Sequence, residues 1–175
     1  FIYPYLIISA GFLVLSFIII ILYKLFMRKP VRINNIKNII VSPCDGLVTK
    51  VDNNHISIFL AVFDVHWQYA PVDSTVKSIE TISGGYKMAT EPESSHNEGV
   101  KVVFSSKYGD ISVTQRVGFF VRRIQNNINV DDKVKQSEPY GVIRFGSRVD
   151  IILPDKVKCI LKKNQIVIGG ITPLI

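Results

Sequence analysis

The chain has 175 residues, of which 47% are hydrophobic and 20% charged, and its mean hydropathy is +0.27. This composition excludes a disordered chain and a collagen-like repeat, and two cysteines, Cys44 and Cys159, are too few for a disulfide scaffold. The net charge of +7 suits either nucleic acid or an anionic membrane surface. Because the chain starts with an apolar segment, we expect a membrane and no nucleic-acid partner.

The first 23 residues contain no charged side chain and predict a membrane-spanning helix. Leu6 to Leu22 is almost continuously apolar, close to the roughly 20 residues that cross a bilayer. A cleaved signal peptide is the competing interpretation, but the run is long and no small-residue cleavage site follows it. Residues 1–23 are therefore expected to be a retained anchor, either single-pass or one leg of a hairpin.

A basic linker over residues 24–38 follows the anchor, and its first cations are Lys24, Arg28, Lys29 and Arg32. Positive charge beside a membrane helix tends to stay in the cytosol. We therefore expect residues 39–175, the remaining domain, to lie on the cytosolic face of the membrane.

Residues 39–175 predict an all-β domain, because short β-branched and aromatic runs alternate with turn residues and no 3.6-residue period persists. The expected strands are 39–41, 47–51, 56–63, 100–104, 111–117, 142–145, 149–153, 157–161 and 166–168. Strands spaced in this way without helices indicate an antiparallel barrel or sandwich, and a Pro-x-Asp-Gly turn before a strand is typical of lipoyl-type barrels. The polar segment 84–99 predicts a mobile loop.

Two motifs could carry chemistry, although each has an ordinary structural explanation. His66 follows the strand expected to be most buried, where a hydrogen-bonded structural histidine is the alternative to a catalytic one. Asp45 precedes a glycine, which is a common turn arrangement. The three histidines are not spaced as metal ligands, so we expect no metal site.

Two glycine motifs complete the set. Gly146-Ser147 lies between two strand-like runs, where glycine indicates a bulge or a close backbone approach. Lys87 follows Gly-Gly-Tyr, as in a carrier-domain lysine hairpin, but a solvated turn lysine is the simpler interpretation.

Five blocks of sequence carry a family resemblance: Phe26–Pro30, Val41–Gly46, Val62–His66 with Ala70-Pro71, Val121–Ile124 and Tyr140–Asp150. Together they make the chain resemble the phosphatidylserine decarboxylases, particularly the shorter bacterial and archaeal type. The blocks stand in family order over essentially the whole chain, and the last block is the most specific.

The resemblance implies that this chain makes its own pyruvoyl cofactor from Ser147. The serine hydroxyl would attack the carbonyl carbon of Gly146, and elimination from the resulting ester followed by hydrolysis would leave the pyruvoyl group and ammonia. The precursor would split into a β chain ending at Gly146 and an α chain starting at the former Ser147, and the two would stay associated. Such an attack needs a base and oxyanion stabilisation.

The resemblance also implies the substrate. The pyruvoyl ketone would condense with the amine of phosphatidylserine and accept electrons as CO₂ leaves, which yields phosphatidylethanolamine. The substrate lies in the bilayer, where a basic linker attracts anionic lipid by about 1 kcal/mol per nearby cation. A homo-oligomer is left open.

Individual roles follow from the family motifs. Asp45 matches an aspartate implicated in self-cleavage, and His66 matches the first histidine of a His-x-x-His-x-Pro pattern, which assists decarboxylation. The second histidine of that pattern, the usual base in self-cleavage, falls on Tyr69, which leaves His66 or a water bound to Asp45 as the base. Arg122 and Arg123 would hold phosphate or carboxylate, or are surface charges.

The sequence thus predicts a membrane-anchored, all-β, pyruvoyl-dependent phosphatidylserine decarboxylase proenzyme. One alternative is an inactive membrane-tethered β module that binds anionic lipid without turnover, an interpretation that Tyr69 keeps open. The other is a decarboxylase of a different amine.

Overall fold

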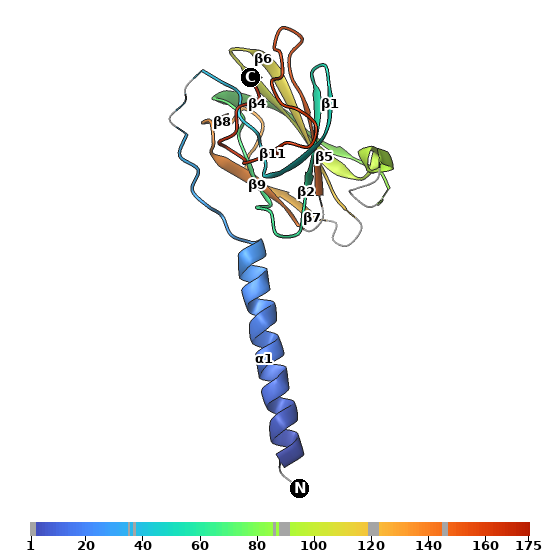
Figure 1. The fold of residues 1–175 in the computed structure, drawn as a ribbon. Coiled ribbons are helices and arrows are strands. Elements are labelled where there is room, and N and C mark those ends of the chain that lie inside the picture. Colours follow the sequence, from blue (N-terminus) through green and yellow to red (C-terminus); the bar gives the residue numbers. More distant parts are fainter. Residues whose placement is uncertain are drawn as a thin grey trace.

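The computed structural model describes residues 3–34, 36, 38–85, 87, 92–118, 123–144 and 147–175. One long helix, α1 (Tyr3–Phe26), projects from a β domain like a stem (Figure 1). The strands are β1 (Gly46–Asp52), β2 (His55–Leu60), β3 (Trp67–Tyr69), β4 (Ser74–Ile82), β5 (Gly99–Ser106), β6 (Gly109–Arg116), β7 (Arg123–Asn126), β8 (Lys133–Val134), β9 (Pro139–Arg144), β10 (Ser147–Ile152) and β11 (Ile166–Val167), with one 3₁₀ turn, η1 (Pro92–His96). The expected fold class, an antiparallel β domain behind one apolar helix, is confirmed.

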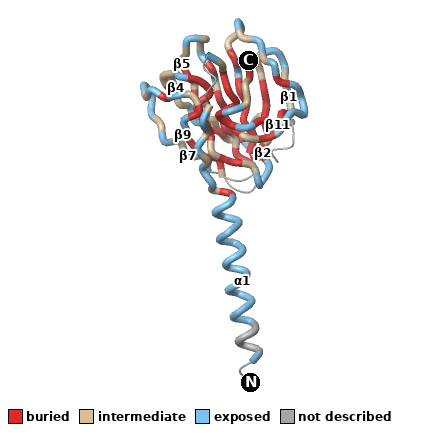
Figure 2. Tube along the Cα trace, turned by 60° about the vertical axis from the view of Figure 1, so that its left-hand side comes forward, coloured by how far each residue is buried: buried red, intermediate tan, exposed pale blue. Residues whose placement is uncertain are grey.

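The strands form two sheets. The larger sheet has the order β11-β1-β2-β10-β6-β5-β4-β8, and the smaller one has the order β3-β9-β7. Neighbouring strands are antiparallel in both sheets. Phe104 of β5 packs edge-to-face on Tyr140 of β9, with ring centroids 5.3 Å apart, so the core lies between the two sheets. Figure 2 shows the buried chain gathered inside the β domain.

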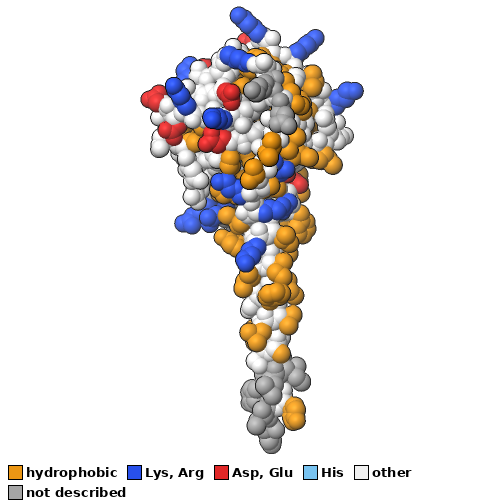
Figure 3. All heavy atoms as spheres, turned by 90° about the vertical axis from the view of Figure 1, so that its left-hand side faces the viewer, with side chains coloured by type: hydrophobic (Ala, Val, Ile, Leu, Met, Phe, Trp, Pro, Cys, Tyr) orange, Lys and Arg blue, Asp and Glu red, His pale blue; other side chains and the backbone are white. Residues whose placement is uncertain are grey.

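The helix α1 is apolar and exposed along almost its whole length (Figures 2 and 3). Residues Ile8–Phe26 are long and apolar enough to cross a membrane, judged by length and composition. The helix ends at Phe26, four residues before Pro30. A proline disfavours helical backbone in the preceding residue, here Lys29, so the helix does not continue through this point. Lys and Arg side chains gather where the helix meets the domain (Figure 3). This helix is therefore a candidate membrane anchor.

Three expected strands differ from the structure. The strand expected over 56–63 ends at Leu60, and Val62 and Phe63 are 52% and 72% exposed on the loop that follows. Residues 39–41 form no strand, and Val41 makes an isolated β-bridge to Pro173.

The run 157–161 also forms no strand. Its backbone bonds to a turn, through Val157 N and Pro154 O, and to the C-terminal tail, through Ile160 N and Leu174 O. Apolar composition alone predicted these segments as strand, but residues 39–41, 61–63 and 157–161 belong to neither sheet of the described structure.

The polar segment 84–99, which we expected to be too polar for the core, has buried residues in its described part. Ser94 and Asn97 are fully buried, and Asn97 binds three backbone groups at 2.7–2.9 Å. The side chain of Asn97 thereby joins Lys87 to Val117, at the end of β6. Buried polar groups of this kind are usually fully hydrogen-bonded, and here they fasten the loop.

Candidate active site

Ser147 begins β10, a central strand of the larger sheet between β2 and β6. Its side chain shares a face with Val149 and Ile151, because alternate residues of a strand point the same way, and both of those residues lie in the core. Ser147 is 0% exposed, and its Oγ has no hydrogen-bond partner within the described part of the chain. Leaving a buried hydroxyl unpaired costs about 1–3 kcal/mol, so this position needs an explanation other than stability. Gly146 lies outside the described residues.

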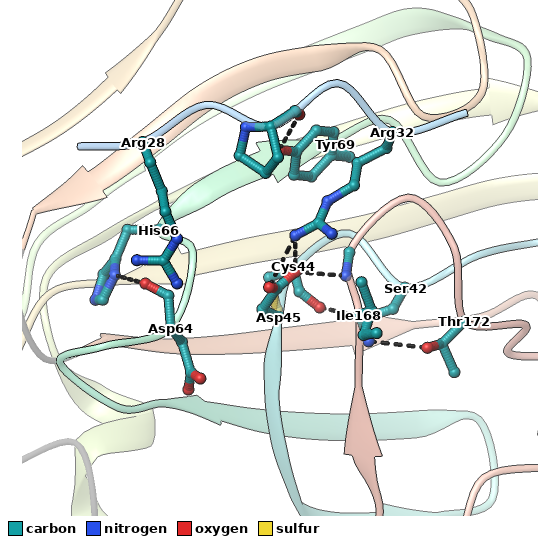
Figure 4. A network of polar contacts seen from close by, with 12 residues as sticks. Arg28, Arg32, Ser42, Cys44, Asp45, Asp64, His66, Tyr69, Ile168 and Thr172 are labelled. Atoms are coloured by element: carbon teal, nitrogen blue, oxygen red, sulfur yellow. Dashed lines mark hydrogen bonds and ion pairs between the residues drawn. The ribbon is translucent and has the colours of Figure 1, made fainter. Parts of the chain in front are cut away.

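Asp45 lies immediately before β1, and two groups hold its carboxylate. The backbone N–H of Gly169 donates to Oδ1 at 2.8 Å, and Nη2 of Arg32 donates to Oδ1 and Oδ2 at 3.0 and 2.9 Å (Figure 4). Burial raises the pKa of Asp45 above its ordinary value, whereas the Gly169 N–H and the Arg32 charge oppose that rise. Gly46, which follows, has φ +145°, and a Cβ there would lie 2.3 Å from the Phe59 carbonyl oxygen. A glycine is therefore required beside this carboxylate.

The strand register brings Asp45 and Ser147 to the same end of the larger sheet. Leu47 pairs with Phe59, so Gly46 lies beside Leu60, and Leu60 pairs with Ser147 on its other side. The backbones of Gly46 and Ser147 are thus two strand spacings apart, which is about 9–10 Å.

His66 lies between the loop that follows β2 and the start of β3. Its Nδ1 is 2.9 Å from the carbonyl oxygen of Asp64, so Nδ1 carries the proton and Nε2 holds the lone pair. His66 is 0% exposed, and Nε2 has no hydrogen-bond partner among the residues that the structure describes. Burial lowers the pKa of His66, so the imidazole is neutral at pH 7.

The backbone connects His66 to the Ser147 end of the sheet. The Ile143 N–H donates to the His66 carbonyl oxygen at 3.1 Å, and Ile143 lies four residues before Ser147. Among the sequence-predicted residues, Asp45, His66 and Ser147 therefore share one region of the domain.

Tyr69 is fully buried and serves as a contact for the linker. Its hydroxyl donates to the Pro30 carbonyl oxygen at 2.9 Å, and the Arg32 guanidinium lies 5.7 Å from the centre of its ring. Burial raises the pKa of Tyr69 above its ordinary value, so the phenol stays protonated at neutral pH. A protonated phenol that already donates to a carbonyl is poorly suited to act as a base.

The residues Phe26–Arg32, here called the juxtamembrane segment, run along this region (Figure 4). Trp67 Nε1 donates to the Met27 carbonyl oxygen at 3.3 Å, and Arg28 donates to the Phe63 carbonyl oxygen at 2.6 Å. Lys29 lies over the Trp67 ring at 4.3 Å. The sequence predicted these cations only as a basic linker beside the membrane, and no motif in it indicated their contacts with the domain.

A second polar cluster lies on the face of β10 opposite Ser147, and no sequence motif indicated it. Asp150 accepts hydrogen bonds from Ser57 Oγ at 2.7 Å, Arg148 Nε at 2.8 Å and Arg116 Nε at 2.9 Å. Burial alone would raise the pKa of Asp150, but these hydrogen bonds and the Arg148 charge hold it below its ordinary value. Arg148 also donates to Ser94 Oγ at 3.3 Å, so the cluster ties η1 to the strand that Ser147 begins.

The remaining candidates are less informative. Arg122 lies outside the described residues, and Arg123, the first residue of β7, is exposed and pairs in register with Arg144. Lys87 is exposed. Within the described ranges, no group of three or more His, Cys, Asp or Glu side chains could hold a metal ion.

An apolar groove of about 320 Å³ lies between α1 and the loop after β2, lined by Ile19, Leu22, Tyr23, Phe26, Val62 and Phe63. Phe26 also contacts the imidazole of His66, with ring centroids 4.1 Å apart. Phe26 is therefore shared by the groove on the candidate anchor and the candidate active site.

Comparisons with known proteins point to one family. The family model described as phosphatidylserine decarboxylase matches residues 21–174. The phosphatidylserine decarboxylase proenzyme of Streptomyces coelicolor is 37% identical over 152 residues, which is 84% of this chain and 70% of the relative. The protein of the same name from Wolbachia pipientis wMel is 35% identical over an alignment of 183 positions, which covers 94% of this chain and 80% of the relative.

An archaeal relative carries a different lipid in its name. A Methanosarcina mazei protein, provisionally named archaetidylserine decarboxylase proenzyme, is 36% identical over 159 residues, which is 90% of this chain and 74% of the relative. The family match and these identities agree over most of the chain. The chain therefore belongs to the phosphatidylserine decarboxylase family.

Proposed function

We propose that this protein is a membrane-anchored decarboxylase that converts phosphatidylserine to phosphatidylethanolamine with a pyruvoyl group formed from Ser147. The observation that carries the proposal is the buried Ser147 hydroxyl, unpartnered among the described residues at the sheet end where Asp45 lies. A hydroxyl placed for reaction with its own backbone needs no permanent hydrogen-bond partner. The family membership supports the same reaction.

Self-processing starts with loss of the Ser147 hydroxyl proton to a base. Oγ then bonds to the carbonyl carbon of Gly146, the bond from that carbon to the Ser147 nitrogen breaks, and the nitrogen takes up a proton. A proton leaves Cα of the former Ser147 as its Cβ–O bond breaks, which releases the Gly146 carboxylate and leaves dehydroalanine. Addition of water and loss of ammonia complete the ketone.

His66 supplies the base in this proposal, because its Nε2 is unprotonated and faces no described partner. Its lowered pKa keeps the imidazole unprotonated below pH 7, which a base at neutral pH requires. In this proposal, Asp45 is the carboxylate, paired with Arg32, that stabilises the positive charge that His66 acquires.

In turnover, a pyruvoyl group supplies a ketone that accepts the electrons of the broken C–CO₂ bond. The same imidazole of His66 then moves protons at the substrate nitrogen and carbon. Arg123, with Arg122, is proposed to hold the phosphate or carboxylate of the substrate.

The membrane side of the domain supports a lipid substrate. The apolar groove between α1 and Phe63 begins on the candidate anchor and shares Phe26 with His66, so an acyl chain in the groove leaves the head group beside the imidazole. Lys and Arg side chains surround this junction and attract anionic lipid (Figure 3). With its cations on the cytosolic side, the domain faces the cytosol.

The test is an intact-mass measurement of the purified protein beside conversion of labelled phosphatidylserine. We expect two chains, 1–146 and a blocked 147–175, together with labelled phosphatidylethanolamine. Ser147→Ala should stay one chain without turnover, whereas Ser105→Ala, which changes an exposed serine of β5, should behave as the wild type.

Other results separate the alternatives. One uncleaved wild-type chain that binds anionic vesicles without turnover identifies a lipid-binding module. Two chains that leave phosphatidylserine untouched identify a decarboxylase of another amine or of another lipid, and archaetidylserine is the first lipid to try, because a relative bears its name.

A further inference from the structure

We infer that the juxtamembrane segment is a working part of the self-processing centre, and that Arg32 within it is the positioning residue that orients Asp45. This inference rests on the proposed self-processing at Ser147. It assigns to the linker between anchor and domain a role beyond attraction of anionic lipid.

The first support is the geometry of the ion pair. Arg32 Nη2 reaches both oxygens of Asp45, at 3.0 and 2.9 Å, while the Gly169 N–H fixes Oδ1 from another direction. The two side chains are only 14% and 16% exposed, so water screens the pair weakly. The carboxylate is thereby fixed in one orientation by a residue thirteen positions earlier in the chain.

The second support is the way in which the segment is held in place. The Tyr69 hydroxyl binds the Pro30 carbonyl oxygen, and Trp67 Nε1 binds the Met27 carbonyl oxygen, so β3 holds the backbone on the approach to Arg32. A Cβ added at Gly170 would lie 3.1 Å from Cβ of Arg32, and one added at Gly169 would lie 3.0 Å from the Tyr69 ring. The tight Gly169-Gly170 turn therefore closes over both residues.

The third support is the charge around Asp45. Burial and the carboxylate of Asp64 raise the pKa of Asp45, whereas the Gly169 N–H and Arg32 lower it. The other titratable neighbours of Asp45 are the neutral groups Cys44 and Tyr69. Arg32 is the only cation among these groups in the described structure. Without it, Asp45 takes up a proton at higher pH and loses the negative charge that stabilises a protonated base.

The consequence is that anchor and catalytic centre are mechanically linked. Arg32 lies six positions after Phe26, the end of α1, and the segment between them contacts Trp67 and Tyr69. A change in the path of this segment moves Arg32 off Asp45 and slows self-processing before any substrate is bound.

The experiment follows self-cleavage of the full chain after synthesis into detergent or vesicles, at several pH values. We expect Arg32→Gln to slow cleavage by up to about 100-fold at pH 7, because a small misplacement of a catalytic group has an effect of this size. The acid limb of the pH profile should also move to higher pH. Arg32→Lys keeps the charge without the planar guanidinium, so its cleavage rate should lie between those of the wild type and Arg32→Gln.

Two controls isolate the contact. Lys156→Gln removes one exposed charge from the turn that follows β10, at the opposite end of that strand from Ser147, so its cleavage profile should match the wild type. In an Asp45→Asn background, Arg32→Gln should cause no further slowing, since residues that act together are not additive.

Two outcomes overturn the inference if the wild type still cleaves. One is an unchanged cleavage rate and pH profile in Arg32→Gln, and the other is full additivity of the slowing caused by Arg32→Gln and Asp45→Asn. Failure of the proposed function is different: the wild type itself remains one chain, and the inference falls with it. If Arg32→Gln does not fold, as judged by its thermal unfolding, Arg32→Lys decides, and a wild-type pH profile in that variant also overturns the inference.

Discussion

Phe26, the last residue of α1, stacks on His66 with ring centroids 4.1 Å apart and ring planes inclined by 37°. The end of the candidate membrane anchor thus touches the imidazole that we propose as the base. This contact also buries His66 and so contributes to the fall in its pKa. Chemistry on a lipid head group fits this placement, because head groups lie at the depth where a membrane helix leaves the bilayer.

We predict that His66→Ala lowers decarboxylation by about 10²–10⁴-fold, the usual contribution of a general acid–base. Because Tyr69 is not available as a base, cleavage at Ser147 should slow as well. Conversion of labelled phosphatidylserine and gel-resolved cleavage measure the two steps. His96→Ala is the matched control, since the His96 side chain is exposed at the end of η1. Normal values for both steps in His66→Ala would return His66 to a structural role.

The pH dependence follows from the lowered pKa of His66. The unfolded chain binds a proton as the pH falls through the ordinary value of 6.5, whereas the folded chain does so only at lower pH. As the pH decreases from the unfolded pKa to the folded pKa, the free energy of unfolding should therefore decrease. His66→Gln should remove this part of the pH dependence. Thermal unfolding in detergent between pH 7.5 and pH 5 provides the measurement, and an identical slope in both proteins contradicts the assignment.

The Asp150 cluster should matter for stability first. Asp150→Asn leaves Arg148 and Arg116 with an uncharged partner, and breaking a buried ion pair in this way costs about 3–5 kcal/mol. Since the folded pKa of Asp150 is lowered, its contribution is present above the ordinary value of 3.8 and is lost as the pH falls through the folded value.

The measurement for Asp150→Asn is thermal unfolding in detergent at pH 7, where the unfolding midpoint should drop. Asp110→Asn is the control, because Asp110 forms an exposed ion pair with Lys77 and its loss should leave the midpoint nearly unchanged. Equal midpoints for the two variants would mean that the Asp150 cluster contributes no net stability.

How much of the fold the sequence predicts depends on how local the signal is. The strands expected over 100–104 and 111–117 correspond to β5 and β6, because turn residues and alternation are both local features. The extension of β2 to Phe63 was wrong, because Val62 and Phe63 are apolar where they face α1 rather than the core. The strand β4 was missed, since its burial alternates only weakly.

The site shows the same division. Short motifs singled out Asp45, His66 and Ser147, because each stands beside a glycine or at the end of an apolar run. The contact between Arg32 and Asp45 has no such signal. It depends on how the chain returns from the anchor to the domain, and charge counting cannot separate one linker cation from the others. Arg148 and Asp150 are two positions apart on β10, so the sequence itself places both side chains on one face of that strand, where the polar cluster lies.

Tyr69 stands where the family pattern has a second histidine, and we expect that its hydroxyl is not the base for self-cleavage. Tyr69→Phe removes only the hydroxyl that donates to the Pro30 carbonyl oxygen and keeps the ring beside Arg32. Loss of one such hydrogen bond costs about 0.5–1.5 kcal/mol, so cleavage at Ser147 should slow by no more than about tenfold. If the phenol were the base instead, the same change would stop cleavage. Tyr108→Phe, in the turn between β5 and β6, controls for loss of a phenol elsewhere, and gel-resolved cleavage rates at pH 7 distinguish the two roles.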